Sequence, residues 1–518
     1  MKFPICILIS LILLTGSIAF AQTGTNYILL PEGLPVDSVV KTAAHISPSA
    51  RQAAWQELEF TVFFHFGINT FAGLEWGNKD VKTKIFNPSE LDARQWVRTA
   101  KEAGAKLAIL VAKHHDGFCN WPSKYTEYSV KNTPWRDGNG DLVKEVSDAC
   151  KEYSLKFGVY VSPWDIHSEL YGTDQYNTYF ENLLREVLTL YGEISEVWFD
   201  GACGEGPNGK KQVYDWMGYY KLVRELQPKA VIAIMGPDVR WVGTESGYGR
   251  ETEWSVVPLP RVSIESMGVG SKHASSEDIF LPPGDMMQKE LGSDERIKEA
   301  AGLAWYPSEV DVSIRPGWFY HEKEDSLVKS PDKLVDIWFS SAGRNSVLLL
   351  NLPPDKRGLI NENDVKSLKG MRAILDSAFR NNLAAGAAII PANGNPKFKP
   401  ENMTDSKPGT YWTNKKGSKT ASIILELKQQ CSFNCLGIQE YFRDGQRVES
   451  FSLEIPDGKS WKTVASGTTI GYKRLLRFPT VHAKSVRIRI NSSRDNPEIS
   501  EIGLYSLPER LIPVEIQK

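Results

Sequence analysis

Histidine and carboxyl side chains follow apolar runs in the first two thirds of the chain. Asp200 comes directly after the apolar run VWF and is followed by a Gly-rich loop, which argues against a helix N-cap. Period-2 alternation along a strand places Trp198 and Asp200 on one side. A carboxylate at such a position can act as a nucleophile, a general base or a ligand. We therefore interpret Asp200 as an active-site carboxylate.

A second carboxyl group would complete a glycosidase site. Cleavage of a glycosidic bond needs one carboxyl to attack or activate water and one to protonate the leaving oxygen. The loop after the fifth apolar run contains Glu245, and Glu251 and Glu253 lie farther on. Glu245 is flanked by glycine and can reach inward, whereas Glu253 starts an apparent strand. Spacing alone leaves the choice among the three open.

Three of the eight histidines lie at two neighbouring strands: His65, His114 and His115. They could donate hydrogen bonds to substrate hydroxyls, be satisfied core residues, or bind a hydrolytic metal ion. Adjacent side chains on a strand point in opposite directions, which argues against His114 and His115 binding one ion. Tryptophans near strand ends could form the apolar wall on which a sugar ring stacks: Trp76, Trp164, Trp198, Trp241 and Trp318.

Eight apolar segments are the strand candidates: residues 61–68, 106–113, 157–163, 196–201, 230–236, 253–258, 310–316 and 346–354. Connections of ~20–40 residues with helical periodicity join the first five, as repeated βα units require. We predict a (β/α)₈ TIM-like barrel over residues 22–384. In such a barrel, residues past the carboxyl ends of the strands face the active site. A doubly wound open sheet is the alternative, but no Gly-x-Gly-x-x-Gly follows a strand.

The character of the chain changes near residue 384. A small, uncharged, Gly/Pro-bearing segment is followed by short alternating runs at residues 421–427, 435–442, 448–456 and 485–490. Turn residues separate these runs. Residues 385–518 are therefore predicted to form an antiparallel β-sandwich.

The composition excludes an integral membrane protein, a collagen and a mostly disordered chain. Hydrophobic residues make up 41% of the chain and charged residues 24%, the balance of a soluble globular protein. Lys and Arg number 61 against 63 Asp and Glu, so no basic excess indicates nucleic-acid binding. Residues 1–21 have the pattern of a signal peptide, with Lys2, an apolar stretch and Ala19-Phe20-Ala21. We expect an exported protein, periplasmic or extracellular, with no membrane span.

Five cysteines follow the signal peptide, too few and too scattered for a disulfide framework. A local Cys431–Cys435 pair is the one bridge that the spacing suggests.

Seven ordered motifs together resemble glycoside hydrolase family 29, the α-L-fucosidases, over roughly residues 50–365. They are FFHFGINTF (63–71), Glu75-Trp76, KHHDGF (113–118), FGVYVSPW (157–164), VWFDG (197–201), RPGWFYH (315–321) and GRNSVLLLNLPP (343–354). Residues 240–254 and 305–321 resemble the subfamily that acts on α1,3/α1,4-linked fucose. The resemblance implies a retaining exo-hydrolase without metal or cofactor, in which Asp200 is the nucleophile and Glu245 the acid/base.

The same resemblance implies a set of substrate-binding residues for a fucosylated oligosaccharide. They are His65, Glu75, Trp76, His114, His115, Tyr160, Trp198, Arg240 and Trp318. The C-terminal region is similar to discoidin-like domains and family 32 carbohydrate-binding modules. Such domains often bind glycans, sometimes with a structural calcium, and a purely structural role stays open.

Three other hypotheses remain at this point. The first is a glycosidase of the same mechanism for a related sugar, such as an α-L-galactoside. The second is a metal-dependent hydrolase that uses His114, His115 and Asp116. The third is a glycan-binding protein with a decayed site. The oligomeric state is not indicated.

Overall fold

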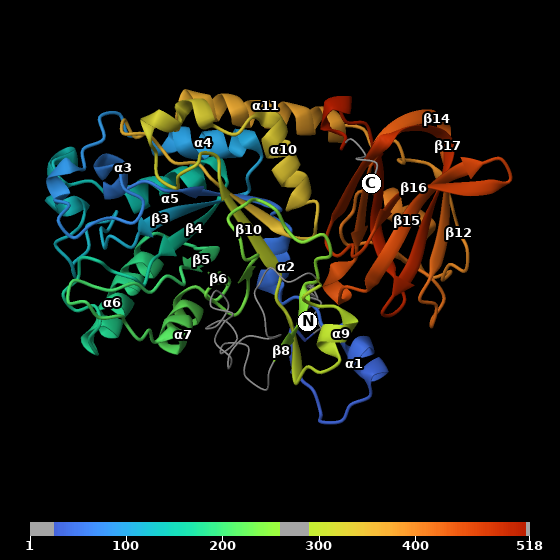
Figure 1. Cartoon of the computed structure of the whole chain (residues 1–518), viewed down its shortest axis with the longest axis horizontal. Coiled ribbons are helices and arrows are strands. Elements are labelled where there is room, and N and C mark those ends of the chain that lie inside the picture. The colour runs from blue at the N-terminus through green and yellow to red at the C-terminus, as the bar shows by residue number, and fades with distance from the viewer. Residues whose placement is uncertain (1–24, 260–289, 514–518) are drawn as a thin grey trace, which may run out of the picture.

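The structure, a computed structural model, describes residues 25–259 and 290–513, so the expected signal peptide lies outside the described residues. Eight parallel strands form a nearly closed barrel in the order β6-β5-β4-β3-β2-β11-β10-β7 (Figure 1). Their bounds are β2 (Phe60–Phe64), β3 (Leu107–Lys113), β4 (Lys156–Val161), β5 (Glu196–Phe199), β6 (Val231–Ile234), β7 (Arg240–Trp241), β10 (Ser308–Ser313) and β11 (Val347–Asn351). A parallel bridge between Ala233 and Val239 joins the two ends of the sheet. The predicted TIM-like barrel is confirmed.

Helices cover the outside of the barrel. They are α4 (Ala93–Ala103), α5 (Leu142–Tyr153), α6 (Gln175–Leu190), α7 (Trp216–Leu226), α10 (Pro331–Ser340) and α11 (Glu362–Phe379). Two of these helices begin at N-cap aspartates. The side chains of Asp92 and Asp141 accept hydrogen bonds from backbone N–H groups in the first turns of α4 and α5. No helix in the described ranges is long and apolar enough to cross a membrane.

The strands divide their side chains between two cores. Val62, Leu110 and Val197 pack outward against the helices. Phe63, Ile109 and Trp198 belong to an inner cluster that fills the barrel. This alternation is the expected consequence of strand geometry in a closed barrel.

One predicted strand is misplaced. The segment predicted at residues 253–258 overlaps β8 (Val256–Leu259), which lies outside the barrel. It pairs with β9 (Gly302–Trp305), which also pairs with β1 (Tyr27–Leu29), in a separate antiparallel sheet. The sixth barrel position belongs to β7, whose two residues are too few to give an apolar run. Four further short helices complete the described fold: α1 (Val36–Ala43), α2 (Ala50–Gln56), α3 (Ile68–Ala72) and α9 (Asp294–Ile297).

The C-terminal part is an antiparallel β structure, as predicted. Its strands are β12 (Ala388–Pro391), β13 (Trp412–Thr413), β14 (Ala421–Glu440), β15 (Val448–Asp457), β16 (Ser460–Gly467), β17 (Arg474–Ser493) and β18 (Glu498–Tyr505). Inward-facing residues such as Trp412, Phe451 and Ile488 form a core separate from that of the barrel.

The suggested Cys431–Cys435 disulfide is absent, and the five described cysteines are all free. Both residues lie on β14. Four residues along a strand span roughly 13 Å, well beyond the Cα separation that a disulfide tolerates.

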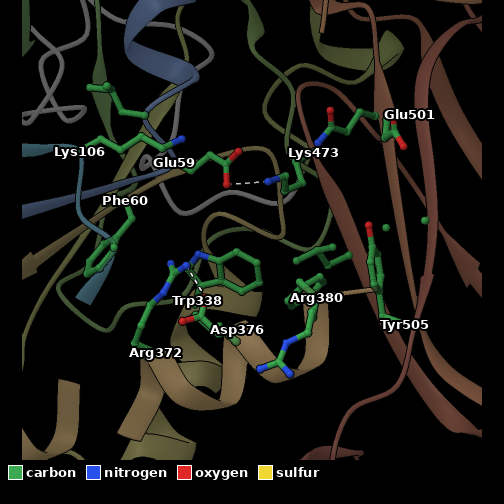
Figure 2. Close-up of a pocket in the computed structure, with 18 of the residues that line it drawn as sticks. Glu59, Phe60, Lys106, Trp338, Arg372, Asp376, Arg380, Lys473, Glu501 and Tyr505 are labelled. Carbon is green, nitrogen blue, oxygen red and sulfur yellow. Dashed lines mark ion pairs between the residues drawn. The ribbon is translucent and has the colours of Figure 1, made fainter. Parts of the chain in front are cut away.

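Polar contacts join the barrel to the sandwich. Gln446 and Asn345 both donate hydrogen bonds to the backbone carbonyl of Glu253, at 3.0 and 3.2 Å. Lys473, which directly precedes β17, pairs with Glu59 at 2.6 Å, at the edge of a cavity of about 450 Å³ between the two domains (Figure 2). Burial alone would raise the pKa of Glu59, but Lys473 and Lys106 hold it below its usual value. The sandwich is therefore fixed to the N-terminal side of β2.

Candidate active site

A blind pocket of about 140 Å³ lies at the carboxyl ends of the barrel strands. Ten of the eleven residues assigned from the sequence line it: His65, Glu75, Trp76, His114, His115, Tyr160, Trp198, Asp200, Glu245 and Trp318. Phe63, Trp164, Ala202, Ile234, Trp241 and Asp311 complete the lining. The barrel thus collects residues separated by up to 255 positions because parallel strands all end at one face.

Asp200 lies at the base of the pocket, 8% exposed. Its Oδ1 accepts a hydrogen bond from the backbone N–H of Ala202 at 2.7 Å, and its Oδ2 accepts one from the Tyr160 hydroxyl at 3.1 Å. His115 Nε2 lies 3.8 Å from Oδ2. Burial and the neighbouring Asp200 raise the pKa of Tyr160, so this hydroxyl keeps its proton and remains a donor. Asp200 is therefore fixed in orientation from two sides.

Glu245 is the only one of the three candidate glutamates that lines the pocket. It is exposed at the mouth, where its Oε2 accepts a hydrogen bond from Trp318 Nε1 at 3.1 Å. Glu251 instead pairs with Arg344 and Arg474. Glu253 is buried against Arg250. Of the carboxyl groups proposed for catalysis, Asp200 is therefore buried and Glu245 is exposed at the mouth.

His65 is a hydrogen-bond acceptor toward the pocket, not the donor that the sequence suggested. Its Nδ1 lies 2.8 Å from Asn351 Oδ1. The amide of Asn351 is oriented because its nitrogen donates to Ser313 Oγ and to the carbonyl of Trp318. His65 Nδ1 must therefore carry the proton. Burial lowers the pKa of His65 to about 3, so the ring is neutral and its Nε2 presents a lone pair.

His114 and His115 both line the pocket, contrary to the expectation that they point in opposite directions. The reason is that β3 ends at Lys113, so strand alternation no longer applies to them. Their ring centroids lie 4.2 Å apart. His115 Nδ1 is 2.7 Å from Ser162 Oγ, which leaves Nε2 directed toward Asp200. Across residues 25–259 and 290–513, no group of three or more His, Cys, Asp or Glu is arranged to hold a metal ion.

Glu75 organises one wall of the pocket. Its Oε2 accepts hydrogen bonds from the backbone N–H groups of Trp318 and Phe319, and its Oε1 contacts His321 Nε2 at 2.7 Å. A Cβ atom on Gly317 would lie 2.7 Å from Oε1, so only glycine allows this approach. Beside Glu75, Trp76 is 64% exposed at the rim.

The structure does not bring Arg240 into the pocket, where a substrate-binding residue was expected. Its side chain is fully buried, where Nε donates to the carbonyl of Tyr306 at 2.9 Å and the guanidinium pairs with Glu253. Adjacent residues of a strand face opposite sides, and in β7 it is Trp241 that faces the site.

Sequence reasoning missed Asp311 and Asn351. Asp311 lines the pocket and accepts a hydrogen bond from Trp241 Nε1 at 2.7 Å. A charged residue inside the apolar strand 310–316 was the available signal. Asn351 ends β11 and orients His65.

The fold and the site define a barrel hydrolase whose pocket combines four carboxyl groups, those of Glu75, Asp200, Glu245 and Asp311, with imidazoles and aromatic rings. The family model for α-L-fucosidases matches residues 37–378, and the model for the F5/8 type C domain matches residues 389–503. The chain belongs to the α-L-fucosidase family and is a glycoside hydrolase.

Relatives match most of the chain. α-L-Fucosidase 1 of Arabidopsis thaliana is 42% identical over 467 residues, covering 88% of this chain and 87% of its own length. A crystal structure of an α-L-fucosidase-family protein from Bacteroides ovatus has 46% identity and a TM-score of 0.83, covering 96% of this chain and 79% of that one. A Ruminococcus gnavus family 29 fucosidase in complex with fucose has 30% identity and a TM-score of 0.78, covering 90% and 96%.

The neutral state of His65 predicts a pH-dependent stability. The pKa of His65 in the folded protein, about 3, lies below its value in the unfolded chain. The contribution of the neutral imidazole to the unfolding free energy is therefore present above about pH 6.5 and is lost as the pH falls toward 3. Between pH 7 and pH 4, wild type should lose about 3 kcal/mol more unfolding free energy than His65→Gln. Urea titrations at both pH values measure this, with the exposed His482→Gln as the matched control. Equal losses in wild type and His65→Gln would show that His65 is not held neutral.

Proposed function

We propose that the chain is a retaining exo-α-L-fucosidase in which Asp200 is the nucleophile and Glu245 the acid/base. The observation that carries the proposal is the placement of these two groups in one blind pocket. Asp200 is buried at the base, where the anomeric carbon of a terminal sugar would lie, and Glu245 is exposed at the mouth, where the leaving group would lie. A pocket closed at its base suits removal of a terminal residue.

The proposed reaction has two displacements. Asp200 attacks the anomeric carbon while Glu245 gives its proton to the glycosidic oxygen, which leaves with the bonding electron pair. A glycosyl-aspartate ester results. Glu245, now ionised, takes a proton from water, and the resulting hydroxide displaces Asp200 from the anomeric carbon. Ala202 N–H and the Tyr160 hydroxyl keep the carboxylate of Asp200 aligned during attack.

The lining of the pocket supports fucose as the sugar. Imidazoles of His65, His114 and His115 suit the ring hydroxyls, and the rings of Trp198 and Trp318 suit an apolar face and a methyl group. An α-L-galactoside differs from a fucoside by one hydroxyl on that methyl carbon. Apolar pockets reject such an addition only about 10²-fold. Residual α-L-galactosidase activity is therefore expected.

Linkage and export are further parts of the proposal. Trp241, Glu245 and Trp318, which lie in the two segments that resemble the α1,3/α1,4 subfamily, line the pocket. We propose α1,3/α1,4-fucosylated oligosaccharides as substrates.

The signal-peptide pattern of residues 1–21 supports a periplasmic or extracellular location.

Glu245→Ala should reduce turnover of substrates with poor leaving groups by about 10²–10⁴-fold, because the leaving oxygen loses its proton donor. Substrates with good leaving groups should suffer less, and azide should restore part of their turnover as a glycosyl azide forms. Kinetics on aryl and oligosaccharide fucosides measure both effects.

The matched control for Glu245→Ala is Glu251→Ala, which removes a nearby carboxyl group that does not line the pocket. Azide rescue of Glu251→Ala, with none for Glu245→Ala, would overturn the acid/base assignment.

The linkage proposal predicts release of fucose from a Lewis-type α1,3/α1,4-fucosylated oligosaccharide and little from α1,2-fucosyllactose. Chelator should change neither result, because Asp200 and Glu245 supply the chemistry. Chromatographic measurement of free fucose tests this. Release from both substrates would overturn the linkage claim, and loss of activity with chelator would favour a metal-dependent hydrolase.

A further inference from the structure

Two glutamates lie side by side inside the barrel below the active site. Glu196 starts β5 and Glu309 lies near the start of β10, and both are fully buried. One oxygen of each has an indole donor: Trp55 Nε1 donates to Glu196 Oε2 at 2.9 Å, and Trp198 Nε1 donates to Glu309 Oε2 at 2.7 Å. Each Oε1 lacks any other donor, and the two carboxyl groups are within hydrogen-bonding reach of each other.

No cation balances this pair in the described part of the chain. The charged group that acts on each carboxyl is the other one, with no contribution from any Lys, Arg or His. The residues beside them are apolar or aromatic: Val231 of β6 pairs with Glu196, Val347 of β11 pairs with Glu309, and Trp55 of α2 contacts Glu196. Two ionised carboxylates in such surroundings would be strongly unfavourable. At least one proton must therefore lie between them.

The pair is connected to the nucleophile through two aromatic rings. Strand alternation places Glu196 and Trp198 on the same inward face of β5, and Asp200, which directly follows the strand, lies in the pocket. Trp198, held by Glu309, stacks on Tyr160 with ring centroids 5.1 Å apart and an interplanar angle of 25°. Tyr160 in turn donates to Asp200. Trp198 also lines the pocket itself.

We propose that Glu196 and Glu309 share a proton and are positioning residues for the active site. The protonated pair fixes the indole of Trp198, and Trp198 fixes the Tyr160 hydroxyl that aligns Asp200. Neither glutamate touches the substrate. The proposal rests on the proposed function in that Asp200 is taken as the nucleophile.

The pair also makes stability depend on pH. Burial raises the pKa of Glu196 to about 7 and that of Glu309 further above its ordinary value. The contribution of the protonated pair to the unfolding free energy is therefore complete below about pH 4.5 and is lost as the pH rises through 7 and beyond. Asp311 of β10 and Asp200, the residue directly after β5, line the pocket and do not contribute to these shifts.

Three substitutions separate the shared proton from simple packing. Glu196→Gln and Glu309→Gln each replace the bridging O–H with an amide N–H, so the contact between the two side chains and the indole hydrogen bonds are kept. Both should retain kcat/KM within about fivefold. Glu309→Leu removes the acceptor for Trp198 Nε1, and the unpaired indole should lower kcat/KM about tenfold or more, mainly through kcat. Near-UV circular dichroism should report a changed tryptophan environment in Glu309→Leu alone.

Infrared spectroscopy tests the proton directly and does not depend on activity. The difference between wild type and Glu196→Gln at pH 6 should contain the carbonyl stretch of a protonated carboxyl group. Glu440→Gln is the matched control, since Glu440 is a buried carboxyl of the sandwich with a pKa raised by burial to about 7 and with backbone donors from Gly471, Val448 and Arg447. The Glu440→Gln variant should change how the unfolding free energy depends on pH and should leave kcat/KM unchanged.

Absence of the protonated band, or equal kinetic losses in Glu309→Gln and Glu309→Leu, would overturn the proposal. A protein with the band but without fucosidase activity would refute the proposed function and leave the proton-sharing pair standing. An active fucosidase without the band would refute the proton-sharing pair and leave the proposed function standing.

Discussion

The alternation of inward and outward side chains in a closed parallel barrel is the constraint on which the site depends. In β5 it places Glu196 and Trp198 in successive layers of the barrel interior, and Asp200, the residue directly after the strand, follows them at the pocket. A shift of β5 by one residue would replace Asp200 with Phe199 or Gly201 at the base of the pocket, and the carboxyl group would be lost from the site.

The loops at the mouth need separate supports because strand geometry does not extend to them. Glu75 holds the segment of Trp318 and Phe319, and Trp318 contacts Glu245. The buried Arg240–Glu253 pair anchors the chain on either side of the loop that carries Glu245. The carbonyl of Glu253 is held by Gln446 from the sandwich. The C-terminal domain therefore contributes to the geometry of the catalytic one even though none of its described residues lines the pocket.

Sequence reasoning succeeded where a long apolar run or a strand end carried the information. The barrel, the sandwich and the position of Asp200 at a strand end follow from such signals, whereas Glu245 was distinguished from Glu251 and Glu253 only by the family resemblance. It failed where local pattern and tertiary position differ. β7 has only two residues, so it leaves no apolar run to show that Arg240 lies on a strand and faces away from the site. His114 and His115 lie past the last residue of β3, where alternation ends. Asp311 lies within an apolar strand, where its charge was the one sign of a functional position.

The most direct test of this account is to trap the intermediate. A 2-deoxy-2-fluoro-α-L-fucosyl fluoride has a leaving group that needs no acid and a fluorine that slows hydrolysis of the ester. After reaction with the intact protein, proteolysis and mass spectrometry should find the fluorosugar on Asp200, with α-configured fucose as the first product of ordinary substrates. A label on Glu245 or Asp311, or a product of inverted configuration, would contradict the account.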